Sequence, residues 1–94
     1  MTNEQDEVLQ QAILEFGDTA QITMAIEECA ELINVLCKQC RKRVNTQDII
    51  TEIADVTIMM RQLSMMYGEF PVEVEIKRKI NRLRERIEKH NING

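Results

Sequence analysis

Aromatic residues and chain breakers are scarce in this sequence. Trp is absent, Tyr occurs once and Phe twice, while Pro occurs once and Gly three times. Few positions therefore interrupt regular secondary structure. The hydrophobic fraction of 44%, which includes six Met, indicates a folded domain with an aliphatic core. We expect residues 1–94 to form a single domain.

The chain also lacks an excess of basic residues and a long apolar run. Its net charge is −4, and non-specific nucleic-acid binding requires a surplus of Lys and Arg, so we expect no nucleic-acid partner. No run is long and apolar enough to span a membrane, and the polar start MTNEQDEV does not resemble a signal peptide. We therefore expect a cytoplasmic protein with no membrane partner.

Histidine occurs once, at His90, which limits the metal sites that the chain can form. Cys37 and Cys40 have a CxxC spacing, but no second CxxC pair is present and no predicted strand precedes this one. Structural zinc sites and redox CxxC motifs need those partners. Three cysteines in a chain without a secretory signal suggest reduced thiols. We interpret Cys37 and Cys40 as structural residues.

The spacing of apolar residues predicts an all-α fold with four helices and no strand. The first helix is expected over residues 3–16, and Gly17 ends it. Asp18 with Gln21 is typical of an N-cap and capping-box pair, and predicts the start of a second helix. That helix is expected to continue to about Arg41.

The third and fourth helices have their own start and stop signals. Asn45 with Asp48 repeats the capping pattern, and the third helix is expected to end near Tyr67, with Gly68 at its C-terminal cap. Pro71 is then placed in the first turn of the fourth helix, where proline is tolerated. The fourth helix is predicted to be amphipathic, with an apolar stripe formed by Val72, Ile76, Ile80, Leu83 and Ile87.

The third predicted helix is apolar on nearly every side. Its Ile, Val, Leu and Met side chains cover most of its circumference, which is typical of a buried helix. The other three helices of one 94-residue chain would not cover it fully, whereas a second copy would. We therefore expect a four-helix-bundle-like fold completed by homo-oligomerisation, as a homodimer or homotetramer.

Two pairs of carboxylates continue the apolar stripes of the second and third helices. Glu28 and Glu31 lie in the segment EECAEL, and Glu52 and Asp55 lie in TEIADV. Residues three apart share a helix face, so each pair would lie at the edge of the core. Four ionised carboxylates converging there would repel one another and lose hydration, and a divalent cation such as Mg²⁺ would compensate. Such pairs also occur on solvated helices, where they bind nothing.

In this helical setting, EECAEL followed by TEIADV resembles the ExxE…ExxD signature of the MazG-like all-α nucleoside triphosphate pyrophosphohydrolases. The resemblance extends along nearly the whole chain, as far as KRKINRLRERI. It implies hydrolysis of a (d)NTP at the α–β phosphate bond to the monophosphate and pyrophosphate. It also implies that Glu28, Glu31, Glu52 and Asp55 bind Mg²⁺, with Mn²⁺ as a substitute. Glu28 or Glu31 is our candidate for the general base.

Candidate substrate-binding residues lie outside the acidic segments. Lys79, Arg82 and Arg86 lie beside the apolar stripe of the fourth helix, and similar basic residues contact phosphate in the family. A solvated charged face explains these three residues equally well. For the base, the resemblance suggests stacking on Phe16 and an amide contact from Gln21, although we favour a core position for Phe16. Many relatives have a Trp near the base, and its absence here leaves the base preference open.

Two further functions remain as alternatives. The first is a non-catalytic helical module that oligomerises through the third helix, with structural acids. The second is a phosphoribosyl-ATP pyrophosphohydrolase, which we rank lower because the acidic segments and KINRLRERI look more MazG-like. Metal titration separates an enzyme from an interaction module, because a ligand that binds the folded state raises its stability.

Overall fold

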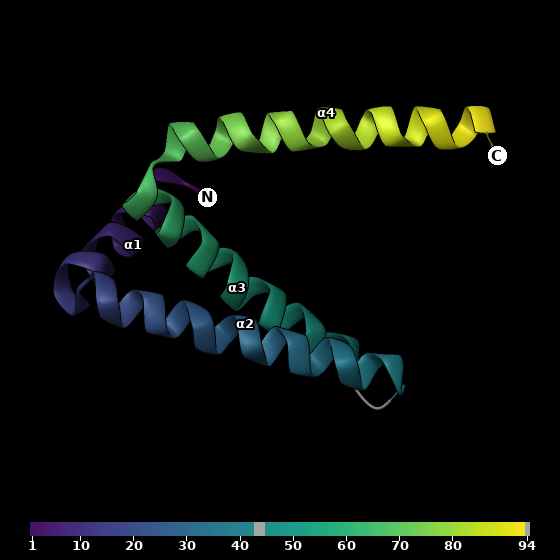
Figure 1. Ribbon diagram of the computed structural model, residues 1–94. Helices are drawn as coiled ribbons and strands as arrows, with labels where there is room; N and C mark the ends of the chain where they lie inside the picture. Colours follow the sequence, from purple (N-terminus) through teal and green to yellow (C-terminus); the bar gives the residue numbers. More distant parts are fainter. Residues whose placement is uncertain (43–44, 94) are drawn as a thin grey trace.

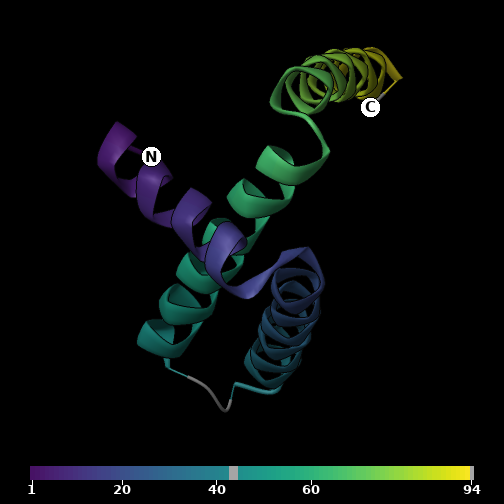
Figure 2. The same cartoon turned by 90° about the vertical axis from the view of Figure 1, so that its left-hand side faces the viewer.

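The computed structural model describes residues 1–42 and 45–93, and this part of the chain contains four helices and no strand. The helices are α1 (Asn3–Phe16), α2 (Asp18–Cys40), α3 (Thr46–Tyr67) and α4 (Glu69–Asn93). The prediction of an all-α fold is therefore confirmed. Helices α2 and α3 form an antiparallel hairpin, and α4 extends away from it (Figure 1). Helix α1 crosses α3 (Figure 2) and packs on both helices of the hairpin.

Local features mark where α1 and α2 begin: a capping box at α1 and a glycine with positive φ at α2. At the start of α1, the Thr2 side chain accepts from the Gln5 backbone and the Gln5 side chain accepts from the Thr2 backbone, which is a complete capping box. The predicted Asp18 cap is wrong. Gly17, with φ of 89°, is the N-cap of α2, and Asp18 is its first helical residue. Gln21 is only 3% exposed and faces the core.

The predicted ends of α3 are confirmed. The Asn45 side chain accepts a hydrogen bond of 2.9 Å from the Asp48 backbone N–H. At the other end, the Gly68 N–H donates to the Ser64 carbonyl at 2.8 Å. Gly68 has φ of 124°, and a Cβ there would lie 3.2 Å from the ring of Pro71. Backbone conformation and the close proline ring therefore both favour glycine at this junction.

An arginine in the C-terminal half of α3 connects three helices. The Arg61 guanidinium donates to both carboxylate oxygens of Asp6, at 3.0 and 2.8 Å, and forms an ion pair of 2.6 Å with Glu69. The bond from Arg61 lowers the pKa of Asp6, and Asp6 in turn raises the pKa of Arg61. This cluster connects α1 and the start of α4 to α3.

A single chain buries little apolar surface. Among the described residues the buried apolar side chains are Leu9, Ala25 and Met59, and the buried polar ones are Gln21 and Gln62. The Gln62 amide nitrogen donates to the Leu9 carbonyl at 3.3 Å. Large apolar side chains on every helix are exposed. On α2 and α3 they are Met24, Ile26, Ile33, Leu36, Ile50, Ile53, Ile58, Met60 and Tyr67.

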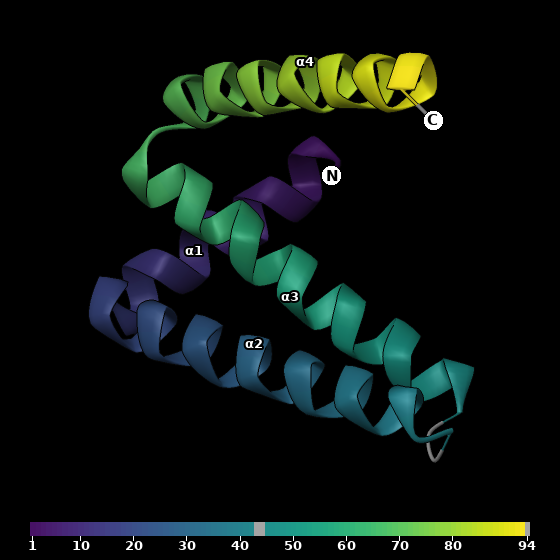
Figure 3. The ribbon, with the colours of Figure 1, turned by 45° about the vertical axis from the view of Figure 1, so that its right-hand side comes forward.

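Helix α4 is the least covered element. It packs against α3 and against no other described helix, and it runs apart from α2 (Figure 3). Its apolar stripe is about half exposed, with exposed fractions of 49% for Ile76 and 53% for Ile80. In the described part of the chain, no helix is both long and apolar enough to cross a membrane.

Candidate functional site

The α2–α3 hairpin brings the two acidic pairs together. One carboxylate oxygen each from Glu28, Glu31 and Glu52 lies within 4.8 Å of the other two. Asp55 lies outside this trio but faces Glu28, and its charge raises the pKa of that residue. Because α2 and α3 are antiparallel and closely packed, residues spaced three apart on each helix meet across the interface.

Two of the four carboxylates have one oxygen that is buried without a partner. Glu28 and Glu52 are half-buried, and the Oε2 atom of each is buried without a hydrogen-bond partner. Burial is the main cause that raises the pKa of Glu28, followed by the charges of Asp55 and Glu31. Burial likewise raises the pKa of Glu52, followed by the charges of Glu31 and Asp55. Ionisation of Glu28 and Glu52 is therefore less favourable than that of a fully solvated carboxyl group.

No basic side chain compensates these charges within the part of the chain that the structure describes. The ion pairs found there join Arg61 to Asp6 and Glu69, and Arg78 to Glu75, all away from the acidic cluster. The repulsion between these carboxylates could be relieved by protonation or by a bound cation. Protons and cations both bind more tightly when like charges are held close together.

The spacing of the cluster suits a small divalent cation. Mg²⁺ binds oxygen at about 2.0–2.1 Å, so two opposite ligands lie about 4.2 Å apart. The oxygens of Glu28, Glu31 and Glu52 lie within 4.8 Å of one another, so side-chain rotations would have to bring adjacent ligand oxygens to about 2.9 Å and opposite ones to about 4.2 Å. The buried Oε2 atoms without partners are suitable ligand atoms. Acidic clusters also occur without an ion, so the geometry permits a cation but does not require one.

The basic residues predicted to bind phosphate lie apart from the acids in a single chain. Lys79, Arg82 and Arg86 line one hollow on α4 together with Leu83. The structure thus brings the three basic residues together, as the helical spacing predicts. Because α4 does not pack on α2, however, it does not bring them to the carboxylates (Figure 1).

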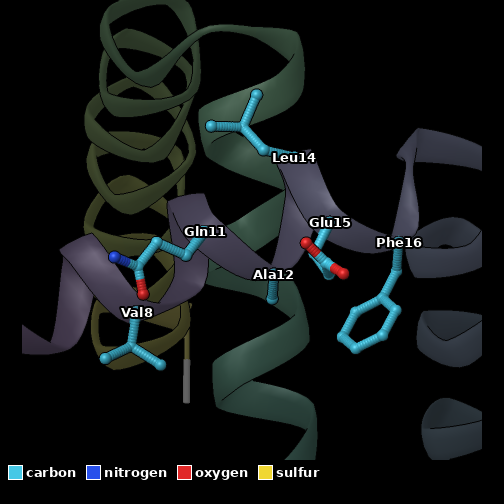
Figure 4. Close-up of a pocket in the computed structure, with 6 residues that line it drawn as sticks. All are labelled: Val8, Gln11, Ala12, Leu14, Glu15 and Phe16. Carbon is cyan, nitrogen blue, oxygen red and sulfur yellow. The ribbon is translucent and has the colours of Figure 1, made fainter.

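The two candidate base-binding residues have opposite environments. Phe16 is 65% exposed at the end of α1, so it is not part of the core of the single chain. It lines an open hollow with Val8, Ala12 and Glu15, in which Val8, Ala12 and Phe16 point to the same side of the helix (Figure 4). Gln21 is buried at 3% exposure, so its amide does not face that hollow.

An apolar groove between α2 and α3 is a feature that the sequence did not single out. Its lining is almost entirely apolar and consists of Ile22, Ala25, Ile26, Cys29, Ala30, Ile33, Met60 and Leu63. Ile26 and Glu28 are separated by about 200° around α2, so the groove and the acidic cluster lie on different sides of that helix. The spacing of Ile22, Ile26 and Ile33 is the signal that could have revealed it.

The ion cluster around Arg61 was also not predicted. Arg61 is the only basic residue of α3, and a lone basic residue in a largely apolar helix indicates an ionic partner. Its partners lie on other helices, and sequence spacing does not identify them.

Comparison with protein families, curated proteins and solved structures finds no match for this chain.

Proposed function

We propose that this protein is a Mg²⁺-dependent nucleoside triphosphate pyrophosphohydrolase that cleaves a (d)NTP to the monophosphate and pyrophosphate. The observation that carries the proposal is the meeting of two carboxylate pairs across the α2–α3 hairpin. Those four acids are also the residues by which the sequence resembles the MazG-like family. The buried oxygens of Glu28 and Glu52, which lack partners, add support, because a charged ligand would stabilise both.

The four acids have two kinds of environment, half-buried and exposed, which suit different roles. Glu28, Glu52 and Asp55 are half-buried and would hold the cation in a fixed position, with Glu31 completing the set. When bound, Mg²⁺ or Mn²⁺ neutralises phosphate charge and makes water more acidic. Glu31 is exposed, so it can also contact solvent. Of the two candidates Glu28 and Glu31, Glu31 is therefore better placed to accept a proton from the attacking water.

We further propose that the protein works as a homodimer or homotetramer. The apolar α2–α3 groove and the exposed Ile53 and Met60 form a surface that a second copy would cover. Lys79, Arg82 and Arg86 are proposed to contact the phosphates. Because α4 does not pack on α2 in the same chain, this role requires α4 of another copy or a change in its direction.

The direct test is an assay of pyrophosphate release from each (d)NTP with pure protein and Mg²⁺. Glu52→Gln and Asp55→Asn should abolish turnover, because each replaces a charged metal ligand by a neutral side chain of nearly the same size. Glu27→Gln is the matched control: Glu27 is exposed and turned by about 100° from Glu28, so this variant should retain activity. Absence of release from every nucleotide by folded protein, or full activity of Glu52→Gln, would contradict the proposal.

A non-catalytic interaction module is the second candidate. The observation that favours it is the large exposed apolar surface on α2, α3 and α4. Such a module should show no change in thermal stability with Mg²⁺ or Mn²⁺. Inclusion of phosphoribosyl-ATP among the assayed substrates tests the remaining alternative in the same experiment.

A further inference from the structure

The charges of this chain are segregated along its length. The first 37 residues contain no Lys or Arg, and their acidic residues are Glu4, Asp6, Glu7, Glu15, Asp18, Glu27, Glu28 and Glu31. Helix α4 carries seven of the twelve basic residues, all between positions 77 and 89. Residues 1–37 therefore form the acidic end of the chain. Helix α4 forms its basic end with only a small excess of positive charge, because its seven basic residues stand beside Glu69, Glu73, Glu75, Glu85 and Glu88. This difference in charge favours contacts between copies that pair the two ends.

The basic end has an apolar surface without a partner. Ile76, Ile80, Leu83 and Ile87 follow the 4-3-4 spacing of a coiled-coil seam and are 49–53% exposed. We call these four residues the α4 stripe. Lys77 and Arg84 flank the stripe on one side, and Lys79 and Arg86 flank it on the other. Helix α4 packs along little of its length, and most helix stability in proteins comes from the packing of an apolar face, so a partner that covers the stripe would stabilise α4.

Pairing of the α4 stripe with itself is disfavoured. In either a parallel or an antiparallel pair, the residues flanking the seam of one helix face those flanking the seam of the other. Here all four flanking positions are Lys or Arg, so either arrangement places positive charges against each other. The stripe therefore requires an apolar surface with acidic flanks.

Helix α1 presents such a surface. We define the α1 outer face by five of the residues that line its open hollow: Val8, Gln11, Ala12, Glu15 and Phe16. Val8 is 61% exposed and Phe16 is 65% exposed. Figure 4 shows the Glu15 carboxylate between Ala12 and Phe16. Glu7 lies at the edge of the same face, and α1 contains no basic residue.

We propose that α4 of one copy docks its stripe on the α1 outer face of a second copy. Lys77 and Arg84 would face Glu7 and Glu15, and two-fold symmetry would let each copy supply one α4 to the other. Within one chain α1 and α4 do not pack together, so both surfaces are available for this exchange. The inference does not depend on the proposed catalytic activity.

The test uses two full-length charge-swap variants. The first is Lys77→Glu/Arg84→Glu, which makes this flank of the stripe acidic. The second is Glu7→Lys/Glu15→Lys, which makes the α1 outer face basic. Glu4 stays unchanged because an acid in the first turn stabilises the helix. Neither variant alters an acid or a basic residue assigned above to metal or phosphate.

Each variant alone should self-associate at least about tenfold more weakly than the wild type, because like charges then meet across the contact. An equimolar mixture should form hetero-pairs in excess over homo-pairs, because both exchanged contacts then regain unlike charges. Native mass spectrometry after subunit exchange measures the two populations. Circular dichroism verifies that both variants remain helical.

Arg78→Glu/Lys89→Glu is the matched control. It makes the same change of net charge on the same helix, but on the side opposite the stripe. This control should associate as the wild type does. Three results would overturn the proposal. They are a statistical mixture of homo- and hetero-pairs, self-association of both variants as strong as that of the wild type, and a loss of self-association in the control equal to that in the charge-swap variants. If α4 instead docked on α1 of its own chain, mixing the two variants would produce no excess of hetero-pairs. That result would also overturn the proposal.

Discussion

Neutralising one half-buried carboxylate should separate stability from function. Glu52→Gln replaces an acid whose Oε2 atom is buried without a partner, and whose pKa is raised first by burial and then by Glu31 and Asp55. Gln has nearly the same shape and no charge, so it removes both the repulsion and the desolvation of a charged group. The metal-free variant should therefore be at least as stable as the metal-free wild type. Its response to Mg²⁺ should be lost.

The size of the wild-type response follows from ligand linkage. A cation present at 100 times its Kd stabilises the folded state by about 2.7 kcal/mol. For a domain of this size, about 1 kcal/mol shifts Tm by about 4–8 °C, so saturating Mg²⁺ should raise Tm by about 10–20 °C. Calorimetric or circular dichroism melts at one fixed protein concentration measure this shift. The fixed concentration removes any contribution from association.

Two results would refute this reasoning. If the Glu52→Gln variant keeps the wild-type response to Mg²⁺, the cation binds elsewhere. If the wild type shows no response to Mg²⁺ or Mn²⁺, the acidic cluster is not a cation site. Glu27→Gln serves as the control in both cases, because it removes one exposed acid from the same helix and should keep the full response.

Three further predictions concern the fold. Arg61 lowers the pKa of Asp6 from its ordinary value of 3.8. Their contact therefore stabilises the protein fully at pH values above 3.8, and this stability is lost as the pH falls through the lowered pKa. Urea melts of Asp6→Asn should therefore show a weaker acid dependence below about pH 4. Met59→Ala should cost about 2–5 kcal/mol in chemical denaturation, because Met59 is 4% exposed. Gly68→Ala should lower Tm more than Gly17→Ala, because only at Gly68 would a Cβ meet a proline ring, at 3.2 Å. Equal shifts would contradict that difference.

The helices and their boundaries could be predicted from the sequence because their causes are local. The bond between Asn45 and Asp48 and the glycine at position 68 involve residues close in the chain. The Asp18 cap failed for an equally local reason. Gly17, with its positive φ, serves as C-cap of α1 and N-cap of α2, so Asp18 falls inside the helix.

The acidic cluster could be predicted in part. A spacing of three fixes a common face on each helix, and the short connection makes α2 and α3 antiparallel neighbours. The sequence could not show that Glu28, Glu31 and Glu52 meet more closely than Asp55 does, because that depends on the register of the hairpin.

The direction of α4 could not be predicted at all. It depends on a tertiary ion pair between Arg61 and Glu69 and on surfaces that one chain leaves uncovered. Lys79, Arg82 and Arg86 therefore share a helix face, as the spacing predicts, but that spacing could not reveal where the face lies relative to the acids.

The small set of buried side chains has a consequence for the abundance of this protein. Leu9, Ala25 and Met59 are the only apolar side chains buried in the described part of the chain, so a lone copy has little to resist unfolding. If copies stabilise one another, dilution alone should unfold the molecule, and its melting temperature should rise with its own concentration. A cell that makes too few copies would then hold mostly unfolded chains, which proteases remove first.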